Sequence, residues 1–198
     1  PTLSSFFVGF NTERVARPAR RAFQAAVDRD QIVSVVTRGA ATPRVGTLPS
    51  GLDGYSRPFE APAGGMSKPA ELGASQKPIE LLIHEQDGAD VLGELVQAQM
   101  ARAGVSVTLK KLDFNTAIQR MVDGTFDALV LSFQYVYSAP EPILASAFHS
   151  RAIPSPNIWR YRNTAVDSLI DRLSAASDPA VVNSIVASIE AAVYEDAP

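Results

Sequence analysis

Two spacings of apolar residues divide the chain into expected strands and helices. Short apolar runs predict strands at 5–10, 79–83, 105–109 and 126–133. The stretch from 79 to 133 alternates strand and helix, which predicts a β-α-β-α-β unit. Because such crossovers are right-handed and join parallel strands in nearly all proteins, we expect an α/β fold with a parallel core and flanking helices.

Capping residues and apolar stripes set the expected helix boundaries. The predicted starts, each at a proline or a capping side chain, are Pro18, Asp28 or Asp30, Asp113, Asn163 and Asp178. The expected buried stripes are Val91, Leu92, Leu95, Val96 and Met100 in the helix over 89–103, and Phe114, Ile118, Met121 and Val122 in the helix after Asp113. The segment 163–197 is predicted to form helices that pack as ordinary core.

The segment from 40 to 78 breaks this regular pattern. It holds six Pro and six Gly and has little periodicity, which predicts a long wrapping loop with at most one short helical turn. Loops of this length are usually functional or pinned to a surface, and a disordered linker is the alternative. The aromatic residues Tyr55 and Phe59 favour pinning.

Composition excludes several classes of protein. A chain of 198 residues makes one or at most two domains, and its Lys and Arg residues are scattered within a net charge of -3, which argues against nucleic-acid binding. No apolar run approaches the ~18 residues of a membrane span, and the N-terminus has no signal-peptide pattern. Cysteine is absent, so disulfides, thiol nucleophiles and Cys-ligated zinc are excluded.

Motifs for catalysis or cofactor binding are not found. The sequence has no Gly-x-Ser-x-Gly elbow, no phosphate-binding loop and no dinucleotide fingerprint. His84 and Glu85 begin like a zinc-protease motif, but Gly88 stands where the second His is required. His149 is expected to be structural. We therefore expect no metal, no cofactor and no enzymatic activity.

The predicted topology points to a ligand site. In open parallel sheets, ligands bind beyond the carboxyl ends of the strands, which here lead into 84–90, 110–113 and 134–142. The two tyrosines that precede the Pro-Glu-Pro stretch in the third of these loops fit an apolar small-molecule or peptide cleft, although such rings can instead pack beneath a loop. The candidate ligand-binding residues at these ends are His84, Gln86, Asp87, Gln134, Tyr135, Val136 and Tyr137.

Several stretches, in order along almost the whole chain, resemble a known family. They are Phe-Val-Gly-Phe-Asn-Thr-Glu at 7–13, Arg-Arg-Ala-Phe-Gln-Ala-Ala-Val-Asp-Arg-Asp at 20–30, Arg-Gly-Ala-Ala-Thr-Pro at 38–43, Leu-Pro-Ser-Gly-Leu-Asp-Gly-Tyr at 48–55, Leu-Asp-Phe-Asn-Thr at 112–116, Phe-Asp-Ala-Leu-Val-Leu at 126–131, Pro-Glu-Pro and Phe-His-Ser around 140–150, and Glu-Asp-Ala-Pro at 195–198. With these residues the chain resembles the extracellular solute-binding proteins, family 5, of ABC transporters for dipeptides, oligopeptides and nickel.

The resemblance implies a periplasmic-binding-protein-like fold in which two lobes close over a ligand. Residues 1–198 then correspond to the second lobe only, and the first lobe of the same protein is expected upstream. The implied partners are a peptide or other small polar solute and the membrane permease subunits, with an extracytoplasmic location and possible lipoprotein anchoring. The alternative is the ligand-sensing domain of a cytosolic transcription regulator, because similar lobes occur behind winged-helix domains.

Two departures from the family pattern concern the ligand and the loop. In the peptide-binding members an Asp after the third strand holds the ligand's α-ammonium group, and Val136 stands at the corresponding position here. Glu141 is close by, but the resemblance makes it part of a rigid Pro-Glu-Pro turn, facing away. Between 58 and 77 the family's Asp-Pro-x-x-Ala helix is replaced by sequence rich in Pro and Gly.

Overall fold

The computed structural model describes residues 4–49, 51–52, 55, 59–60, 77–84, 89–134 and 138–198. Its strands are β1 (Ser4–Phe10), β2 (Ile79–His84), β3 (Val107–Leu112) and β4 (Ala128–Gln134). Its helices are α1 (Arg17–Ala26), α2 (Arg29–Val36), α3 (Ala89–Arg102), α4 (Phe114–Asp123), α5 (Pro140–Phe148), the 3-10 helix η2 (Ser150–Ala152), α6 (Thr164–Ser174) and α7 (Pro179–Asp196). Most of the stretch from 56 to 77, including the departure from the family helix, lies outside these residues.

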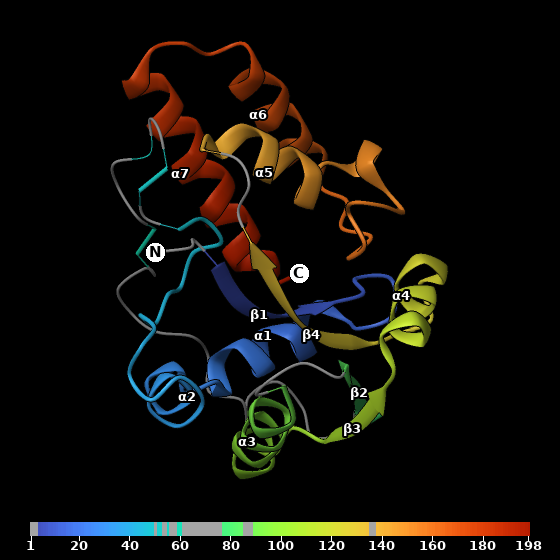
Figure 1. The fold of residues 1–198 in the computed structure, drawn as a ribbon. Coiled ribbons are helices and arrows are strands. Elements are labelled where there is room, and N and C mark those ends of the chain that lie inside the picture. Colours follow the sequence, from blue (N-terminus) through green and yellow to red (C-terminus); the bar gives the residue numbers. More distant parts are fainter. Residues whose placement is uncertain are drawn as a thin grey trace.

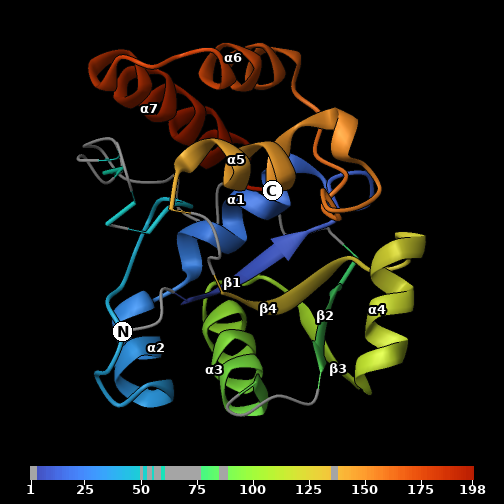
Figure 2. The same ribbon diagram turned by 45° about the horizontal axis from the view of Figure 1, so that its top comes forward.

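The strands form one mixed sheet in the order β1-β4-β2-β3. β2 pairs in parallel with both β3 and β4, which confirms the predicted β-α-β-α-β core, although the strand bounds shift by up to three residues. β1 pairs antiparallel with β4, from Phe10 opposite Ala128 to Ser4 opposite Gln134. This pairing was not predicted. Helices lie on both sides of the sheet, with α5, α6 and α7 together over one side (Figures 1 and 2).

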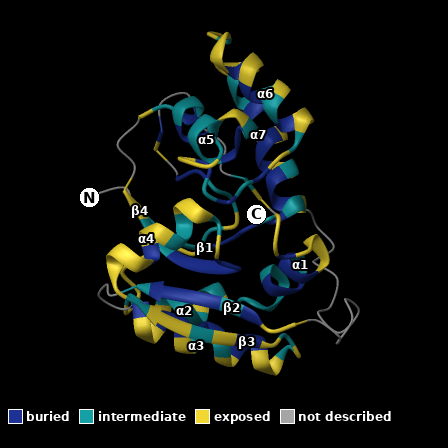
Figure 3. Ribbon diagram, turned by 90° about the vertical axis from the view of Figure 1, so that its right-hand side faces the viewer, coloured by how far each residue is buried: buried dark blue, intermediate teal, exposed yellow. Residues whose placement is uncertain are grey.

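One face of the sheet packs on α1, α2 and α3. Phe10 of β1 meets Phe23 of α1 edge to face, with ring centroids 5.1 Å apart. Around this pair lie the inward residues of the central strands, such as Leu81 and Val130, and the buried stripe of α3. Most of β2, at the centre of this layer, is coloured as buried in Figure 3. The predicted stripe of α1 is buried at Ala19, Ala22 and Phe23, whereas α2 contributes only the partly buried Ile32 and Val36.

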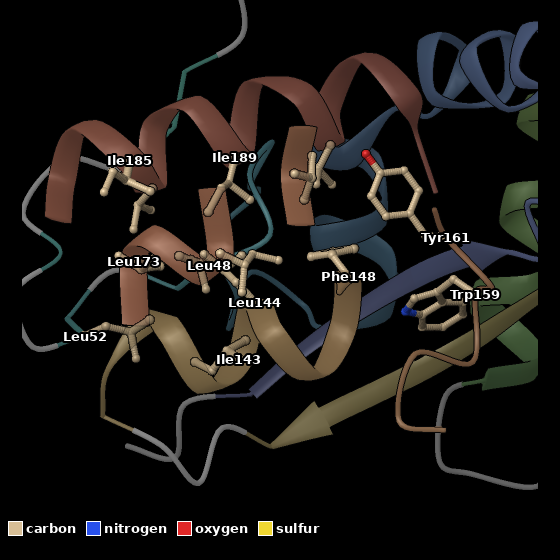
Figure 4. Packing of buried hydrophobic residues seen from close by; sticks show 14 of the residues in the cluster. Leu48, Leu52, Ile143, Leu144, Phe148, Trp159, Tyr161, Leu173, Ile185 and Ile189 are labelled. Carbon is tan, nitrogen blue, oxygen red and sulfur yellow. The ribbon is translucent and has the colours of Figure 1, made fainter. Parts of the chain in front are cut away.

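A second core fills the space between the other face and α5, α6 and α7 (Figure 4). The ring of Trp159 packs against Phe7 with centroids 5.5 Å apart, and a Cβ on Gly9 would collide with the same indole. Only glycine fits at position 9, because the indole of Trp159 occupies the space of a side chain. Leu48 and Leu52, from the Pro- and Gly-rich segment, are buried in this core.

The predicted stripe of α3 is wrong at one position. Val91 is exposed, whereas Gln99 is buried. The Gln99 side chain accepts a hydrogen bond from the Asp28 N–H at 3.0 Å and donates one to the Asp28 carbonyl at 3.2 Å. A polar residue can be buried here because α2 begins at Asp28 and offers backbone partners.

The predicted stripe of α4 is mostly wrong. Phe114, Ile118 and Val122 are exposed, at 58%, 37% and 46% of their surface. Ala117 is buried, and Met121 packs partly against the core. In the described part of the chain, α4 packs mainly against β2. Only a narrow stripe of the helix therefore faces the protein.

The segment after Ser138 also differs from its prediction. Pro140, Glu141 and Pro142 form the first turn of α5 and not a rigid turn of a loop. Proline fits the first turn of a helix because its missing N–H has no intrahelical acceptor there. By contrast, the predicted caps are confirmed: the side chains of Asp28, Asp113, Asn163 and Asp178 accept hydrogen bonds from the first-turn N–H groups of α2, α4, α6 and α7.

A buried carboxylate pins the start of the Pro- and Gly-rich segment to α7. Glu190, 2% exposed, accepts hydrogen bonds from the backbone N–H groups of Thr47 at 2.8 Å and Leu48 at 3.2 Å, and from the Thr47 hydroxyl. The Tyr55 hydroxyl donates to its second oxygen at 3.3 Å. We call these four residues the Glu190 clamp. The clamp, with Phe59 packed on Tyr194, confirms pinning for the described residues of this segment.

The Glu190 clamp leads us to expect a particular dependence of the unfolding free energy on pH in alkaline solution. Burial, with the nearby Glu190 carboxylate as the second cause, raises the pKa of Tyr55 to about 12. The unfolded chain ionises this phenol near its ordinary pKa, so the stability it contributes is complete below about pH 10 and is lost as the pH rises towards the folded value. We expect Tyr55→Phe to reduce the loss of unfolding free energy between pH 9 and 11.5 by about 1–2 kcal/mol. Urea unfolding at both pH values measures this loss, and identical losses in the two proteins would contradict the prediction.

Candidate functional site

The carboxyl ends of the three parallel strands meet at one edge of the sheet. β2 ends at His84, β3 at Leu112 and β4 at Gln134, and His84 lies directly opposite Leu112. β1 begins at this edge, because Ser4 lies opposite Gln134. Of the predicted site residues, His84 and Gln134 are described here. The other five, Gln86, Asp87, Tyr135, Val136 and Tyr137, lie outside the described residues.

His84 is the last residue of β2 and is partly buried. Its ring lies against Phe114, with centroids 5.8 Å apart and the planes at 58°. Its Nδ1 atom is buried and has no hydrogen-bond partner among the residues that the structure describes. A buried polar atom without a partner costs free energy, so His84 would gain free energy from a movement that brings a hydrogen-bond partner to this nitrogen.

Phe114 belongs to this edge, although its spacing predicted a core position. The residue before it, Asp113, caps α4 by accepting hydrogen bonds from the Thr116 N–H at 3.0 Å and the Thr116 hydroxyl at 2.6 Å. These hydrogen bonds hold the pKa of Asp113 below its ordinary value. The cap fixes the first turn of α4 and thereby places the exposed Phe114 ring beside His84.

A small, partly open hollow lies between α4 and the sheet, and we call it the α4 hollow. Six of its lining residues are apolar, and the seventh is His84. The lining residues are Leu82, His84, Ala117, Met121, Leu129, Val130 and Leu131. Leu82 and Leu129 are paired neighbours on β2 and β4, so the hollow extends from the strand ends inward over the sheet.

The C-terminal end of α4 is held firmly. Gly124 ends the helix with a φ of 67°, and its carbonyl accepts a hydrogen bond from the Asn11 side chain at 2.9 Å. Arg160 donates to the Val122 carbonyl at 2.8 Å. Asn11 is buried and comes directly after β1, so this end of α4 is fixed to the sheet. The wall of the α4 hollow is therefore a fixed feature of the fold.

The end of β4 adds an aromatic side chain to the same edge. Side chains alternate between the two faces of a strand, so Phe133 points to the same face as Leu131 of the hollow and Gln134 to the opposite face. Phe133 is 38% exposed and Gln134 is exposed. Phe133 and Phe114 thus present apolar surface at the edge where the topology predicted a ligand.

His149 lies in a different part of the molecule, in the corner between α5 and α6. It is 6% exposed, and its Nδ1 atom accepts a hydrogen bond from the Arg151 N–H at 3.1 Å. The carboxylates of Asp167 and Asp171 lie 3.5 Å from Nδ1 and 3.4 Å from Nε2. These contacts are internal to the corner and agree with a structural role.

The described part of the chain contains neither a metal-binding cluster nor a membrane-spanning helix. No three His, Asp or Glu side chains there lie close enough together to hold a metal ion. Within the same residues, no helix has the length and apolar character needed to cross a membrane.

Comparison with known proteins finds a matching family and several similar proteins. Residues 1–155 match the family described as bacterial extracellular solute-binding proteins, family 5 Middle. The whole chain is 24% identical over 208 residues to probable di/tripeptide-binding protein 5 of Pseudomonas aeruginosa, of which it covers 40%. It is 28% identical over 195 residues to a putative ABC transporter peptide-binding protein of Brucella ovis, with 88% of this chain and 36% of that protein covered. The chain thus spans about two-fifths of the length of these relatives.

Solved structures show the same fold. The murein tripeptide binding protein MppA of Escherichia coli matches all of this chain with a TM-score of 0.87 at 23% identity, over 42% of its own length. The oligopeptide-binding protein AppA of Bacillus subtilis, solved with a nonapeptide, matches 98% of this chain with a TM-score of 0.85 at 20% identity, over 43% of its own length.

Proposed function

Because this chain belongs to the bacterial extracellular solute-binding proteins of family 5, we propose that it is a ligand-capturing lobe of the substrate-binding component of an ABC importer. The proposed ligands are peptides or other small polar solutes. The observation that carries the proposal is the match of the entire chain to peptide-binding relatives that are more than twice as long. In this proposal the protein binds its ligand without catalysing a reaction, and it works outside the cytoplasm.

The carboxyl edge of the sheet supports a binding role in this lobe. It combines exposed aromatic rings, Phe114 and Phe133, with an imidazole that has a buried nitrogen to satisfy. Mostly apolar surface with a few polar groups is typical of small-molecule and peptide clefts. In the proposed mechanism the other lobe closes over this edge, excludes water from the ligand and forms the surface that the permease subunits recognise.

Peptides are the ligand class that this edge fits best. A peptide brings backbone N–H and C=O groups for the polar contacts and side chains for the aromatic rings. Titration calorimetry of the intact protein with di- to pentapeptides tests this assignment, with a neutral disaccharide as the control solute. We expect micromolar affinity for some peptides and none for the disaccharide, and the reverse result would contradict the assignment.

The position of Val136 gives a prediction about the peptide's N-terminus. This residue lies outside the described part of the chain, and it offers no carboxylate for an α-ammonium group. A buried cation without a partner is costly, so we propose that the ligand's free amine is not required. N-acetylation of a bound peptide should then change its affinity by less than about tenfold, which corresponds to ~1.4 kcal/mol. A larger loss on acetylation would show that another acid holds the amine.

A further inference from the structure

The helix α4 carries a row of apolar side chains that no other described part of the chain covers. Phe114, Ile118 and Val122 are 58%, 37% and 46% exposed, and we call these three residues the α4 flank. On the basis of the proposed function, we infer that the second lobe of the intact protein seats on the α4 flank when the two lobes close. In this inference the α4 flank is a latch, that is, a contact that stabilises the closed form.

The apolar side of α4 is wider than the part that the sheet covers. Residues four apart lie one above another on a helix, so the three residues of the α4 flank form one continuous row. Ala117 and Met121 lie next to this row and face the sheet. The other residues of the helix are polar: Asn115, Thr116, Gln119, Arg120 and Asp123. The pattern of α4 is therefore typical of a helix that is covered on both flanks of its apolar side, and this chain covers one of them.

The row is also set apart from the rest of the described surface. The other exposed large apolar residues lie one to an element or loop, and single residues of this kind are normal on a protein surface. An apolar row on one helix is instead typical of a contact with another protein surface. The single residues are Phe6, Val35, Val45, Val91, Phe133 and Val181.

The length of the α4 flank indicates an occupant larger than the ligand. Phe114 lies at the carboxyl edge of the sheet, beside His84. Val122 lies eight residues later, about 12 Å further along the helix and towards the opposite edge of the sheet. A ligand held at the strand ends lies beside the first of these residues, whereas a protein surface can cover the whole row.

The small area of the α4 flank favours a lobe of the same protein over a second copy of this chain. A stable interface between separate chains buries about 800 Å² on each partner, from about 20–30 residues, and three partly exposed side chains supply a small part of that. A lobe of the same polypeptide needs less area because it is already tethered. The relatives have room for such a lobe, since this chain covers 40% of the di/tripeptide-binding protein 5 and 42% of MppA.

Both ends of α4 are fixed before any contact forms. Asp113 caps the first turn, and the Asn11 side chain donates a hydrogen bond to the Gly124 carbonyl at the other end. A row that is already in place loses little conformational freedom when a partner surface arrives. Its apolar surface then leaves water in the closed form alone, which shifts the equilibrium between the open and closed forms towards the closed one.

The first test measures whether the α4 flank becomes covered. Residues 1–198 contain no cysteine, so a cysteine introduced by Val122→Cys can be followed by mass spectrometry of its maleimide-labelled segment in the intact protein. We expect labelling to slow at least about tenfold when a saturating peptide is added, and to slow equally with a dipeptide and a pentapeptide. Asp123→Cys, on the polar side of the same helix, is the control and should change by less than about twofold.

The second test measures whether the contact stabilises the closed form. Val122→Glu places a carboxylate on the α4 flank, and Gln119→Glu places the same group on the polar side. We expect Val122→Glu to release bound peptide at least about tenfold faster, and Gln119→Glu to release it within about twofold of the unsubstituted rate. Equal melting temperatures of the two variants without peptide establish that both are folded, and the cysteine variants test the inference where Val122→Glu fails to fold.

The outcomes separate the latch from the proposed function. Peptide binding that leaves the labelling of Val122→Cys unchanged overturns the latch and leaves the binding function standing. Labelling that is equally slow without peptide, protection that requires the longer peptide, or unchanged release from folded Val122→Glu also overturns the latch. Binding of no peptide at all overturns both.

Discussion

The 198-residue chain alone is expected to bind peptides only at millimolar concentration, even where the intact protein binds the same peptides at micromolar concentration. The chain spans about two-fifths of its relatives, and its α4 hollow is partly open to solvent. If a second lobe supplies about half of the contacts and excludes water, its loss costs ~4 kcal/mol, which is close to a thousandfold in affinity. Parallel calorimetric titrations of the two proteins with one peptide measure this factor.

The two affinities can be compared only if the 198-residue chain folds on its own, and thermal unfolding tests this. Both described cores are built from residues of this chain alone, so we expect a cooperative thermal transition followed by near-ultraviolet circular dichroism of Trp159. Micromolar affinity in the folded chain would show that the whole site lies within these residues, and the two-lobe proposal would then be wrong.

Replacement of Glu190 by alanine should destabilise the protein by about 3 kcal/mol. The variant leaves the backbone N–H groups of Thr47 and Leu48 without their acceptor in a buried place, and it removes the partner of the Tyr55 hydroxyl. Buried donors without acceptors carry the full cost of leaving water, which is larger than the net value of the hydrogen bond itself. Urea unfolding measures the difference.

Two further variants make the Glu190 result specific. Glu190→Gln keeps a carbonyl oxygen that can accept from the backbone, so its loss of stability should be smaller than that of Glu190→Ala. Glu94→Ala removes an exposed glutamate from α3 and should change the unfolding free energy by less than about 0.5 kcal/mol. If Glu190→Ala is no more harmful than Glu94→Ala, the clamp contributes nothing and the segment is held by its apolar residues alone.

Features that depend on neighbouring residues were predictable from the sequence. The starts of α2, α4, α6 and α7 were predicted, because a capping side chain bonds N–H groups two or three residues away. The parallel pairing of β2, β3 and β4 was predictable as well, because a helix between two strands imposes the direction of the second strand. The shared edge, with His84 and Gln134 at strand ends, follows directly from that direction.

Features that depend on distant residues could not be predicted in the same way. The exposure of Phe114, Ile118 and Val122 is set by which elements cover α4, and no local pattern carries that information. One signal did point to Phe114: Asp113 is a capping residue directly after a strand, so the residue that follows it had to lie at the shared edge. α5 was missed because two prolines resemble a loop, whereas both fit its first turn.

The antiparallel pairing of β1 has a consequence for how the chain is made. Its partner β4 lies more than 100 residues later, so at a synthesis rate of about 5–20 residues per second β1 waits roughly 6–25 s for the strand that completes it. During that interval Phe6, Phe7 and Phe10 form an unpaired, aromatic-rich strand, which is the kind of segment that pairs with other chains. We therefore expect aggregation of the nascent chain to increase with the time that this segment waits for β4 during translation.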